Sequence, residues 1–172
     1  PDLADRVFSV NGFAKGWAMT GWRIGWLAGN TEVVKAAIAL QSQSTSNVCS
    51  FAQFGALAAI EGSRDCVHAM AERFNERRQL LSDGLQAIRG LQLLPPEGAF
   101  YAFPDISALG ISDDAFAERL LQEERVAVVP GSAFGESGRG HVRICYAVSE
   151  EKLREALLRI GRFVASLQGV SA

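Results

Sequence analysis

The sequence has little of what marks several large classes of protein. Its 172 residues include three cysteines and two histidines, and its formal net charge is -2. The cysteines form no C-x-x-C pair and the histidines have no metal-ligand spacing, which argues against a disulfide framework and against a zinc site. Free thiols favour a reducing, cytoplasmic location. The absence of a basic excess argues against nucleic-acid binding, and no apolar run is long enough to span a membrane.

The start of the sequence indicates a piece of a longer protein. Pro1 is followed within a few residues by an apolar strand pattern, with no initiator methionine and no signal peptide. The first 62 residues alone would supply two strands and two helices, which make a poor core. We therefore expect further sequence ahead of Pro1.

Periodicity and capping residues predict an α/β chain. In the first part we expect strands over 6–10 and 22–28, followed by helices over 31–41, 51–60 and 64–88. In the second part we expect strands over 91–94, 99–103, 126–129 and 141–148, with helices over 113–123 and from Ser149 onward. The acidic pairs Asp113-Asp114 and Glu150-Glu151 fall at helix starts, where they suit the macrodipole. GESGRG, residues 135–140, is predicted to be a loop.

The stretch NGFAKGWAMTGWRIGW, residues 11–26, contains all three tryptophans and two cations. Lys15 stands among small residues, beside Phe13 and Trp17. An apolar pocket around it would disfavour the charged ammonium form and leave a neutral amine, which attacks carbonyls and forms Schiff bases. The plainer alternative is a solvated surface lysine.

Arg23 is the second cation of this stretch and has apolar neighbours on both sides. Its planar fork suits a bidentate anion such as phosphate or carboxylate, although a structural salt bridge is an equally simple interpretation. A Schiff-base lysine and a phosphate-binding arginine together indicate a small molecule that has both an aldehyde and a phosphate. Pyridoxal phosphate has both groups.

GFAKGWAMTGWRIG resembles the pyridoxal-phosphate attachment signature of class I and II aminotransferases, except that Ala14 stands where many relatives have serine. QSQSTSNVCSFAQFGALAAIEG is similar to the inter-subunit segment and following helix of that family. EGAFYAFPDIS, VAVVPGSAFG and VRICYAVSEEKLREAL resemble its small-domain strands, in the same order. Together these stretches cover nearly the whole chain and suggest the aspartate aminotransferase-like branch.

The resemblance implies a role for three residues. Lys15 would form the Schiff base with pyridoxal 5'-phosphate and then shuttle a proton, and Arg23 would bind the cofactor phosphate. Arg143 would hold the substrate α-carboxylate. On a strand, Val142 and Ile144 share one face and Arg143 lies on the other. An arginine in such a position needs an anion, with a salt bridge to a glutamate as the alternative.

The resemblance also implies an architecture, the C-terminal part of the fold-type I transferase fold. Residues 1–62 would be the tail of the large cofactor-binding domain, including a dimer segment. Residues 63–172 would be a linking helix and an α+β small domain. The implied partners are an amino acid, a 2-oxo acid and a second copy of the protein, with no nucleic acid and no membrane. The aspartate that contacts the cofactor ring nitrogen would lie ahead of Pro1, so we expect this chain to be inactive alone.

Two alternatives remain open at this point. A carbon-sulfur β-lyase would share the fold and the cofactor but release ammonia instead of transferring the amino group. The chain could also act as a non-catalytic small domain with a dimerisation segment.

Overall fold

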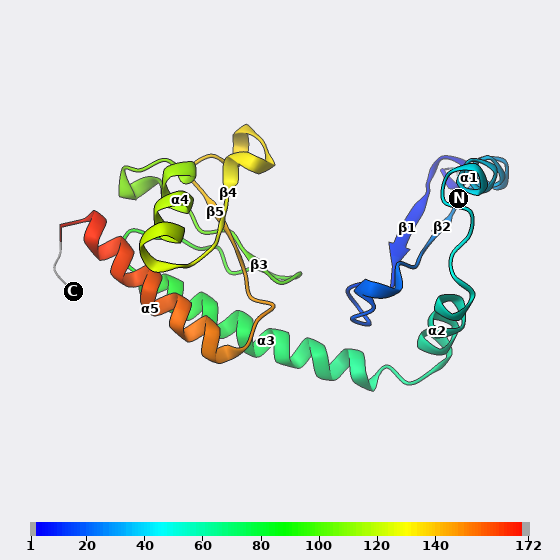
Figure 1. Ribbon diagram of the computed structural model, residues 1–172, viewed down its shortest axis with the longest axis horizontal. Helices are drawn as coiled ribbons and strands as arrows, with labels where there is room; N and C mark the ends of the chain where they lie inside the picture. The colour runs from blue at the N-terminus through cyan, green and yellow to red at the C-terminus, as the bar shows by residue number, and fades with distance from the viewer. Residues whose placement is uncertain (1–2, 170–172) are drawn as a thin grey trace. The chain divides into compact units, whose positions relative to one another are not determined.

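The chain forms two compact units in the computed structural model, which describes residues 3–169 (Figure 1). The first unit covers residues 1–70 and the second unit covers residues 71–172, so the division falls within helix α3 (Asp65–Gln86). The sequence predicts that the cofactor-binding part ends at residue 62 and the small domain begins at residue 63. This boundary stays a prediction, because the division into two units reflects how closely the chain packs and not what each part binds.

The first unit contains a two-stranded antiparallel sheet and two helices. Strand β1 (Ser9–Gly12) pairs with β2 (Gly25–Ala28), in a register that runs from Ser9 opposite Ala28 to Gly12 opposite Gly25. Helices α1 (Thr31–Ser44) and α2 (Ser50–Glu61) follow, and two short 3₁₀ helices, η1 (Ala4–Arg6) and η2 (Thr20–Trp22), precede the two strands.

The start of the helix predicted over 31–41 is confirmed, and Asn30 is its cap residue. The Asn30 Oδ1 atom accepts hydrogen bonds from the backbone N–H groups of Glu32 at 2.9 Å and Val33 at 3.4 Å, and so satisfies two donors that the helix leaves open. The predicted end at Gln41 is wrong, because α1 continues to Ser44. Glutamine is a good helix former, and the chain leaves the helical region only near Ser46, where φ is +62°.

Both predicted strands of the first unit are too long. Residues 6–8 do not belong to a strand, since η1 includes Arg6 and β1 begins at Ser9. Residues 22–24 do not belong to one either, because Arg23 has φ of +52° and ψ of +49°. A left-handed residue cannot continue a β-strand, so β2 begins only at Gly25.

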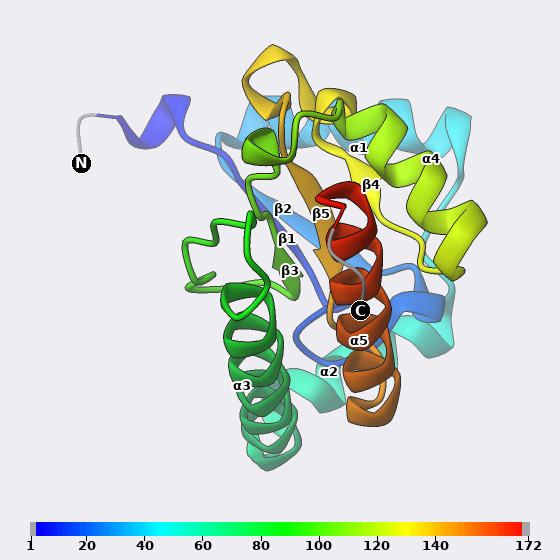
Figure 2. The ribbon, with the colours of Figure 1, turned by 90° about the vertical axis from the view of Figure 1, so that its left-hand side faces the viewer.

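The second unit contains a three-stranded antiparallel sheet in the order β3-β5-β4. The strands are β3 (Tyr101–Ala102), β4 (Val129–Pro130) and β5 (Val142–Cys145), and the helices are α4 (Asp113–Glu124) and α5 (Glu150–Leu167). Figures 1 and 2 show α5 lying alongside both α3 and α4. Ser112 and Ser149 cap α4 and α5 as predicted for Ser149, each accepting a hydrogen bond from a backbone N–H group.

Two predicted strands of the second unit are nearly absent. Residues 91–94 make only an isolated bridge between Gln92 and Asp105, and Leu94 is 91% exposed. Pro95-Pro96 follows directly and has no backbone N–H group to extend a ladder. The strand predicted over 126–129 is reduced to β4, which includes only the last of those residues.

The core of the second unit is formed by apolar side chains from α3, α4, α5 and the sheet. The largest fully buried side chains include Tyr146, Phe116, Phe163, Leu81, Leu85, Ile106, Leu120, Leu153 and Ile160. The rings of Phe116 and Phe163 meet edge to face at 5.1 Å and join α4 to α5. The side of α5 that faces this core carries Leu153, Ile160 and Val164, all of which are buried.

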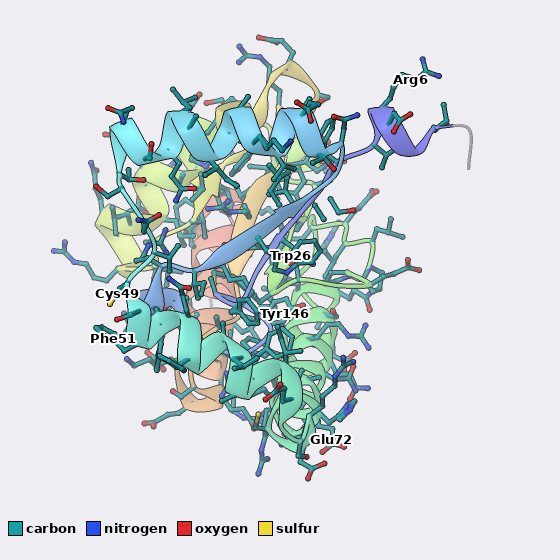
Figure 3. All side chains as sticks on the ribbon, turned by 90° about the vertical axis from the view of Figure 1, so that its right-hand side faces the viewer. Arg6, Trp26, Cys49, Phe51, Glu72 and Tyr146 are labelled. Carbon is teal, nitrogen blue, oxygen red and sulfur yellow. The ribbon has the colours of Figure 1, made fainter. Side chains whose placement is uncertain are left out.

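The first unit has a much smaller core. Its buried cluster consists of Phe13, Met19 and Ala56, with Trp17, Ile24 and Ala59 partly buried against it. Large apolar side chains of α2, among them Phe51 and Phe54, stay exposed. Figure 3 shows Phe51 and Cys49 at the start of α2. The first unit therefore presents several large apolar side chains of one helix to its surroundings.

Among residues 3–169, none of the helices combines the length and the apolar character that crossing a membrane requires.

The two faces of α5 provide a matched test of where the core lies. Leu153 is 2% exposed and Leu158 is 64% exposed. We expect Leu153→Ala to lower the free energy of unfolding of the second unit by about 2–5 kcal/mol, because it leaves a cavity. Leu158→Ala should change it by less than about 0.5 kcal/mol. Urea denaturation followed by circular dichroism measures both, and equal effects of the two substitutions would contradict the packing described.

Candidate active site

Lys15 and Arg23 lie on the same segment, the connection between β1 and β2 (residues 13–24). The connection is anchored by Phe13 and Met19, which are buried with Ala56 of α2. The ring of Phe13 lies 5.2 Å from the ring of Trp17. Phe13 and Met19 therefore point inward and fix the loop, whereas Lys15 and Arg23 are exposed.

Backbone hydrogen bonds close the connection on itself. The N–H group of Phe13 donates to the Ile24 carbonyl at 3.3 Å, and the N–H group of Met19 donates to the Phe13 carbonyl at 3.4 Å. The N–H group of Trp22 donates to the Met19 carbonyl at 3.2 Å. The loop therefore has a defined path from Lys15 to Arg23.

Two glycines permit this path by close approach. A Cβ atom on Gly25 would lie 2.7 Å from the Asn11 carbonyl oxygen, where the two strands meet. A Cβ atom on Gly55 of α2 would lie 2.3 Å from the ring of Trp22. Trp22 thus lies directly against the α2 backbone, and these positions require a residue without a side chain.

The Lys15 side chain is exposed, although its neighbours Phe13 and Met19 are buried. The apolar pocket expected around this amine is therefore not formed within residues 3–169. The Lys15 carbonyl accepts a hydrogen bond from the Ala18 N–H group at 3.2 Å, and Ala18 has φ of +53°. The turn places the lysine at its outer edge.

Arg23 is also exposed and has a left-handed backbone. Such a conformation costs a non-glycine residue about 1–3 kcal/mol and tends to occur where function requires it. Its Nη1 atom donates to the Thr20 carbonyl at 2.9 Å. This is one of the five donors of the guanidinium, so most of the fork can bind an anion.

Two hollows lie in the first unit near this connection. One, of ≈ 470 Å³, is lined by Arg23 together with Thr45, Asn47 and Phe51. The other, of ≈ 610 Å³, is lined by Phe13 and Trp26 together with polar residues such as Gln53, and no cation of residues 3–169 lines it. Figure 3 shows Trp26 on β2. The first hollow therefore combines a cation with polar side chains, as an anion-binding site requires.

Arg143 belongs to the second unit and lies in the middle of β5. The predicted alternation is confirmed, since Val142, Ile144 and Tyr146 are buried while Arg143 is half-buried on the other face. β5 is the central strand of its sheet, so Arg143 is paired through its backbone to Val129 of β4.

The guanidinium of Arg143 lies between two aromatic rings. Its Cζ atom is 4.5 Å from the centroid of the Tyr101 ring and 4.6 Å from that of the Phe134 ring. Among residues 3–169 no carboxylate forms an ion pair with Arg143, so the alternative of a salt bridge to a glutamate is not observed there. Contacts with aromatic rings do not use the N–H donors of the guanidinium, so these donors can still bind a carboxylate.

Sequence reasoning missed Phe134 and the role of Asp113. Asp113 was expected only as an acidic residue at a helix start, but it is 3% exposed, and its Oδ2 atom accepts a 2.7 Å hydrogen bond from the Ser132 N–H group. Backbone and side-chain hydrogen bonds from Ser132 lower the pKa of Asp113 to about 2. The only local signal was the capping pattern, which gives no information on contacts with a segment 19 residues away.

The chain is similar to aminotransferases along nearly its whole length. The family profile described as "Aminotransferase class I and II" matches residues 2–160. The chain is 46% identical to the aspartate/prephenate aminotransferase of Cereibacter sphaeroides, over 97% of this chain and 44% of that protein. It is 44% identical to the aspartate aminotransferase of Pyrococcus horikoshii, over 91% of this chain and 40% of that protein.

Solved structures agree with this similarity. The aspartate aminotransferase of Rhizobium meliloti superposes with a TM-score of 0.91 at 42% identity, covering 99% of this chain and 44% of that one. The aromatic aminotransferase of Pyrococcus horikoshii superposes with a TM-score of 0.93 at 40% identity, covering 96% and 44%. The chain thus matches part of the aspartate aminotransferase fold and spans less than half the length of these relatives.

The hydrogen bonds of Asp113 predict an acid-dependent contribution to stability. The pKa of Asp113 is about 2 in the folded chain, against an ordinary value of 3.8. Because the folded value is the lower one, the stabilisation is present above about pH 4 and is lost as the pH falls towards 2. Asp113→Asn should therefore destabilise the chain at pH 6, and its difference from the wild type should shrink with acidification. Urea denaturation at pH 6, 4 and 3 measures this, with exposed Asp83→Asn as the control. A difference that does not change with pH would contradict the assignment.

Proposed function

The chain belongs to the class I and II aminotransferase family, and from this we propose that it is the C-terminal part of a pyridoxal-phosphate-dependent aminotransferase of the aspartate aminotransferase-like branch. The activity proposed for the full-length polypeptide is transfer of an amino group between an amino acid and a 2-oxo acid. The observation that supports it most directly is the presence of Lys15 and Arg23 on one ordered connection in a chain of this family.

The two cations of the first unit fit the chemistry of pyridoxal phosphate. An exposed amine matches its aldehyde, and an exposed guanidinium with unused donors matches its phosphate. When bound, the cofactor supplies an electron sink that eases loss of a proton from the substrate Cα. Lys15 would hold the cofactor through Nζ and would carry the substrate Cα proton on the same atom to the carbonyl carbon of the cofactor.

Arg23 binds and orients the phosphate. Its carbonyl-bound Nη1 atom holds the side chain against Thr20, so the guanidinium is partly ordered before the anion arrives. Preorganisation of this kind lowers the entropy that binding must otherwise lose. The strained backbone of Arg23 is consistent with selection for a particular direction of the side chain.

Arg143 binds the substrate α-carboxylate. The rings of Tyr101 and Phe134 lie against the guanidinium, and a carboxylate would meet it along its edge, in the plane where two parallel hydrogen bonds form. Each such bond to a charged group is worth roughly 1.5–3 kcal/mol. All amino-acid and 2-oxo-acid substrates share this carboxylate, so Arg143 serves both halves of the reaction.

We propose that the exposed apolar surface of the first unit is covered by the rest of the polypeptide and by a second copy of the protein in a homodimer. Phe51, Phe54 and Ile60 of α2 are exposed in this chain, and leaving such side chains in water is costly. Cover from these sources would also enclose Lys15 and exclude water from its amine. This chain alone is therefore expected to have little or no activity.

The relatives suggest which substrates to try first. Two of them are described as acting on aspartate, one of these also on prephenate, and a third as an aromatic aminotransferase. Dicarboxylic and aromatic amino acids are accordingly the substrates proposed for the full-length polypeptide. Transfer to a 2-oxo acid also separates this function from a β-lyase, which would release ammonia.

Labelling of lysine tests the cofactor assignment. The chain has three lysines, Lys15, Lys35 and Lys152, and Lys35 already pairs with Glu32 at 3.0 Å. We expect borohydride reduction of the full-length protein with pyridoxal phosphate to attach one pyridoxyl group at Lys15, because only this lysine lies on the β1–β2 connection. Peptide mass mapping locates the group.

The matched variants are Lys15→Ala and Lys35→Ala. The first should lose the label together with the cofactor absorbance of the reduced protein, and the second should keep both. A pyridoxyl group on Lys35 or Lys152 in the wild type would rule out the role given to Lys15.

A further inference from the structure

The geometry points to Asp113 as a positioning residue for the substrate carboxylate site, because its carboxylate joins both ends of the loop that places Phe134 on Arg143. The inference rests on the proposed function at one point, namely that the substrate carboxylate binds to the N–H groups along the edge of the Arg143 guanidinium. In this inference Asp113 does not touch the substrate and acts on the carboxylate site through the loop formed by residues 131–140.

Asp113 holds the loop from both sides. It lies in the first turn of α4, directly after the cap residue Ser112, and is buried. Its Oδ2 atom accepts from the Ser132 N–H group at 2.7 Å, and its Oδ1 atom accepts from the Gly140 N–H group at 3.4 Å. Asp114 adds a weaker contact, since the Ser132 hydroxyl donates to its carboxylate at 3.3 Å.

The loop between these two points has little freedom of its own. The backbones of Gly131 and Gly138 touch so closely that a Cβ atom on either would overlap the other residue. The Gly131 N–H group donates to the His141 carbonyl at 2.9 Å, and the Gly135 N–H group donates to the Ser132 carbonyl at 3.1 Å. A shift at Ser132 is therefore transmitted to the whole loop.

Phe134 is the part of the loop that reaches Arg143. It ends the short 3₁₀ helix η4 (Gly131–Phe134), which begins directly after β4, and its side chain is 50% exposed. β4 pairs with β5, where Val129 is opposite Arg143. The sheet thus fixes the backbone of Arg143. The Phe134 ring is placed by the loop that Asp113 holds, together with an edge-to-face contact with the Phe103 ring at 6.1 Å.

Loss of this ring would free one face of the guanidinium. With both rings in place the plane of the guanidinium is restricted, and a bidentate carboxylate requires one particular plane. Asp113→Asn removes one of the two acceptors and turns an NH₂ group towards a backbone N–H donor. One of the two hydrogen bonds by which Asp113 holds the loop would then be lost.

Binding of an unreactive dicarboxylate to the full-length protein with its cofactor tests the positioning role of Asp113 without turnover. The probes are maleate, which has no amino group to react, and maleamide, its uncharged diamide. Calorimetry gives the dissociation constant for each, and thermal melting is measured beside it. A purely structural role for Asp113 would lower the melting temperature and leave the preference for maleate over maleamide unchanged.

We expect Asp113→Asn to weaken maleate binding about 3- to 10-fold, the size of one half-buried cation–π contact. Phe134→Leu should have the same effect, and the double variant should lose no more than either single one. Arg143→Lys should lose about 10- to 100-fold, since it removes the fork itself. Asp83→Asn, an exposed control on α3, should bind maleate like the wild type, and maleamide should be unaffected throughout.

The outcomes distinguish the role of Arg143 in binding the carboxylate from the role of Asp113 in positioning the loop. Wild-type affinity for maleate in Arg143→Lys would contradict the carboxylate role in the proposed function. A weakened Arg143→Lys beside unchanged Asp113→Asn and Phe134→Leu would contradict the positioning role alone. If Asp113→Asn fails to fold, Phe134→Leu decides, because its half-exposed ring makes it the milder change, and wild-type affinity in that variant would overturn the inference.

Discussion

The burial of Phe13 and Met19 against Ala56 is the constraint on which the first unit depends. These side chains make up the buried cluster of a unit whose other large apolar residues are mostly exposed. Because they alternate with Lys15 and Arg23 along one connection, fixing them inward fixes the two cations outward. The glycines at the close approaches, Gly25 and Gly55, permit this packing and carry no chemistry themselves.

The second unit fixes its cation by a different means. Arg143 lies on the central strand of a sheet and is flanked by rings from two other elements, Tyr101 of β3 and Phe134 of η4. One ring comes from a strand that pairs with β5, and the other comes from a loop held by the buried carboxylate of Asp113. Aromatic faces hold the arginine in place without neutralising it, so its charge remains available for an anion.

Local patterns predicted the helices well and the strands poorly. Two helices begin where they were predicted, directly after the cap residues Asn30 and Ser149, because capping depends on residues two or three positions apart. The strands shrank where the backbone turned left-handed at Arg23 or where prolines removed donors after residue 94. Neither effect is visible in the alternation of apolar residues on which the strand predictions depended.

The site was partly predictable for the same reason. The alternation along β5 placed Arg143 on the face away from the core, as the structure confirms. Its aromatic neighbours could not be predicted, because Tyr101 and Phe134 come from segments distant in sequence. The contact of Asp113 with Ser132 likewise leaves no periodic signal. The apolar pocket expected around Lys15 is not formed by residues 3–169, because the side chain is exposed there.

Transfer of the amino nitrogen is the most direct test of the proposed chemistry. The full-length protein with pyridoxal phosphate is incubated with ¹⁵N-labelled aspartate or phenylalanine and unlabelled 2-oxoglutarate, and the products are analysed by mass spectrometry. The proposed mechanism predicts that the label appears in glutamate, with the matching 2-oxo acid as the other product. Label recovered as ammonia, or no labelled glutamate from either amino acid, would contradict it.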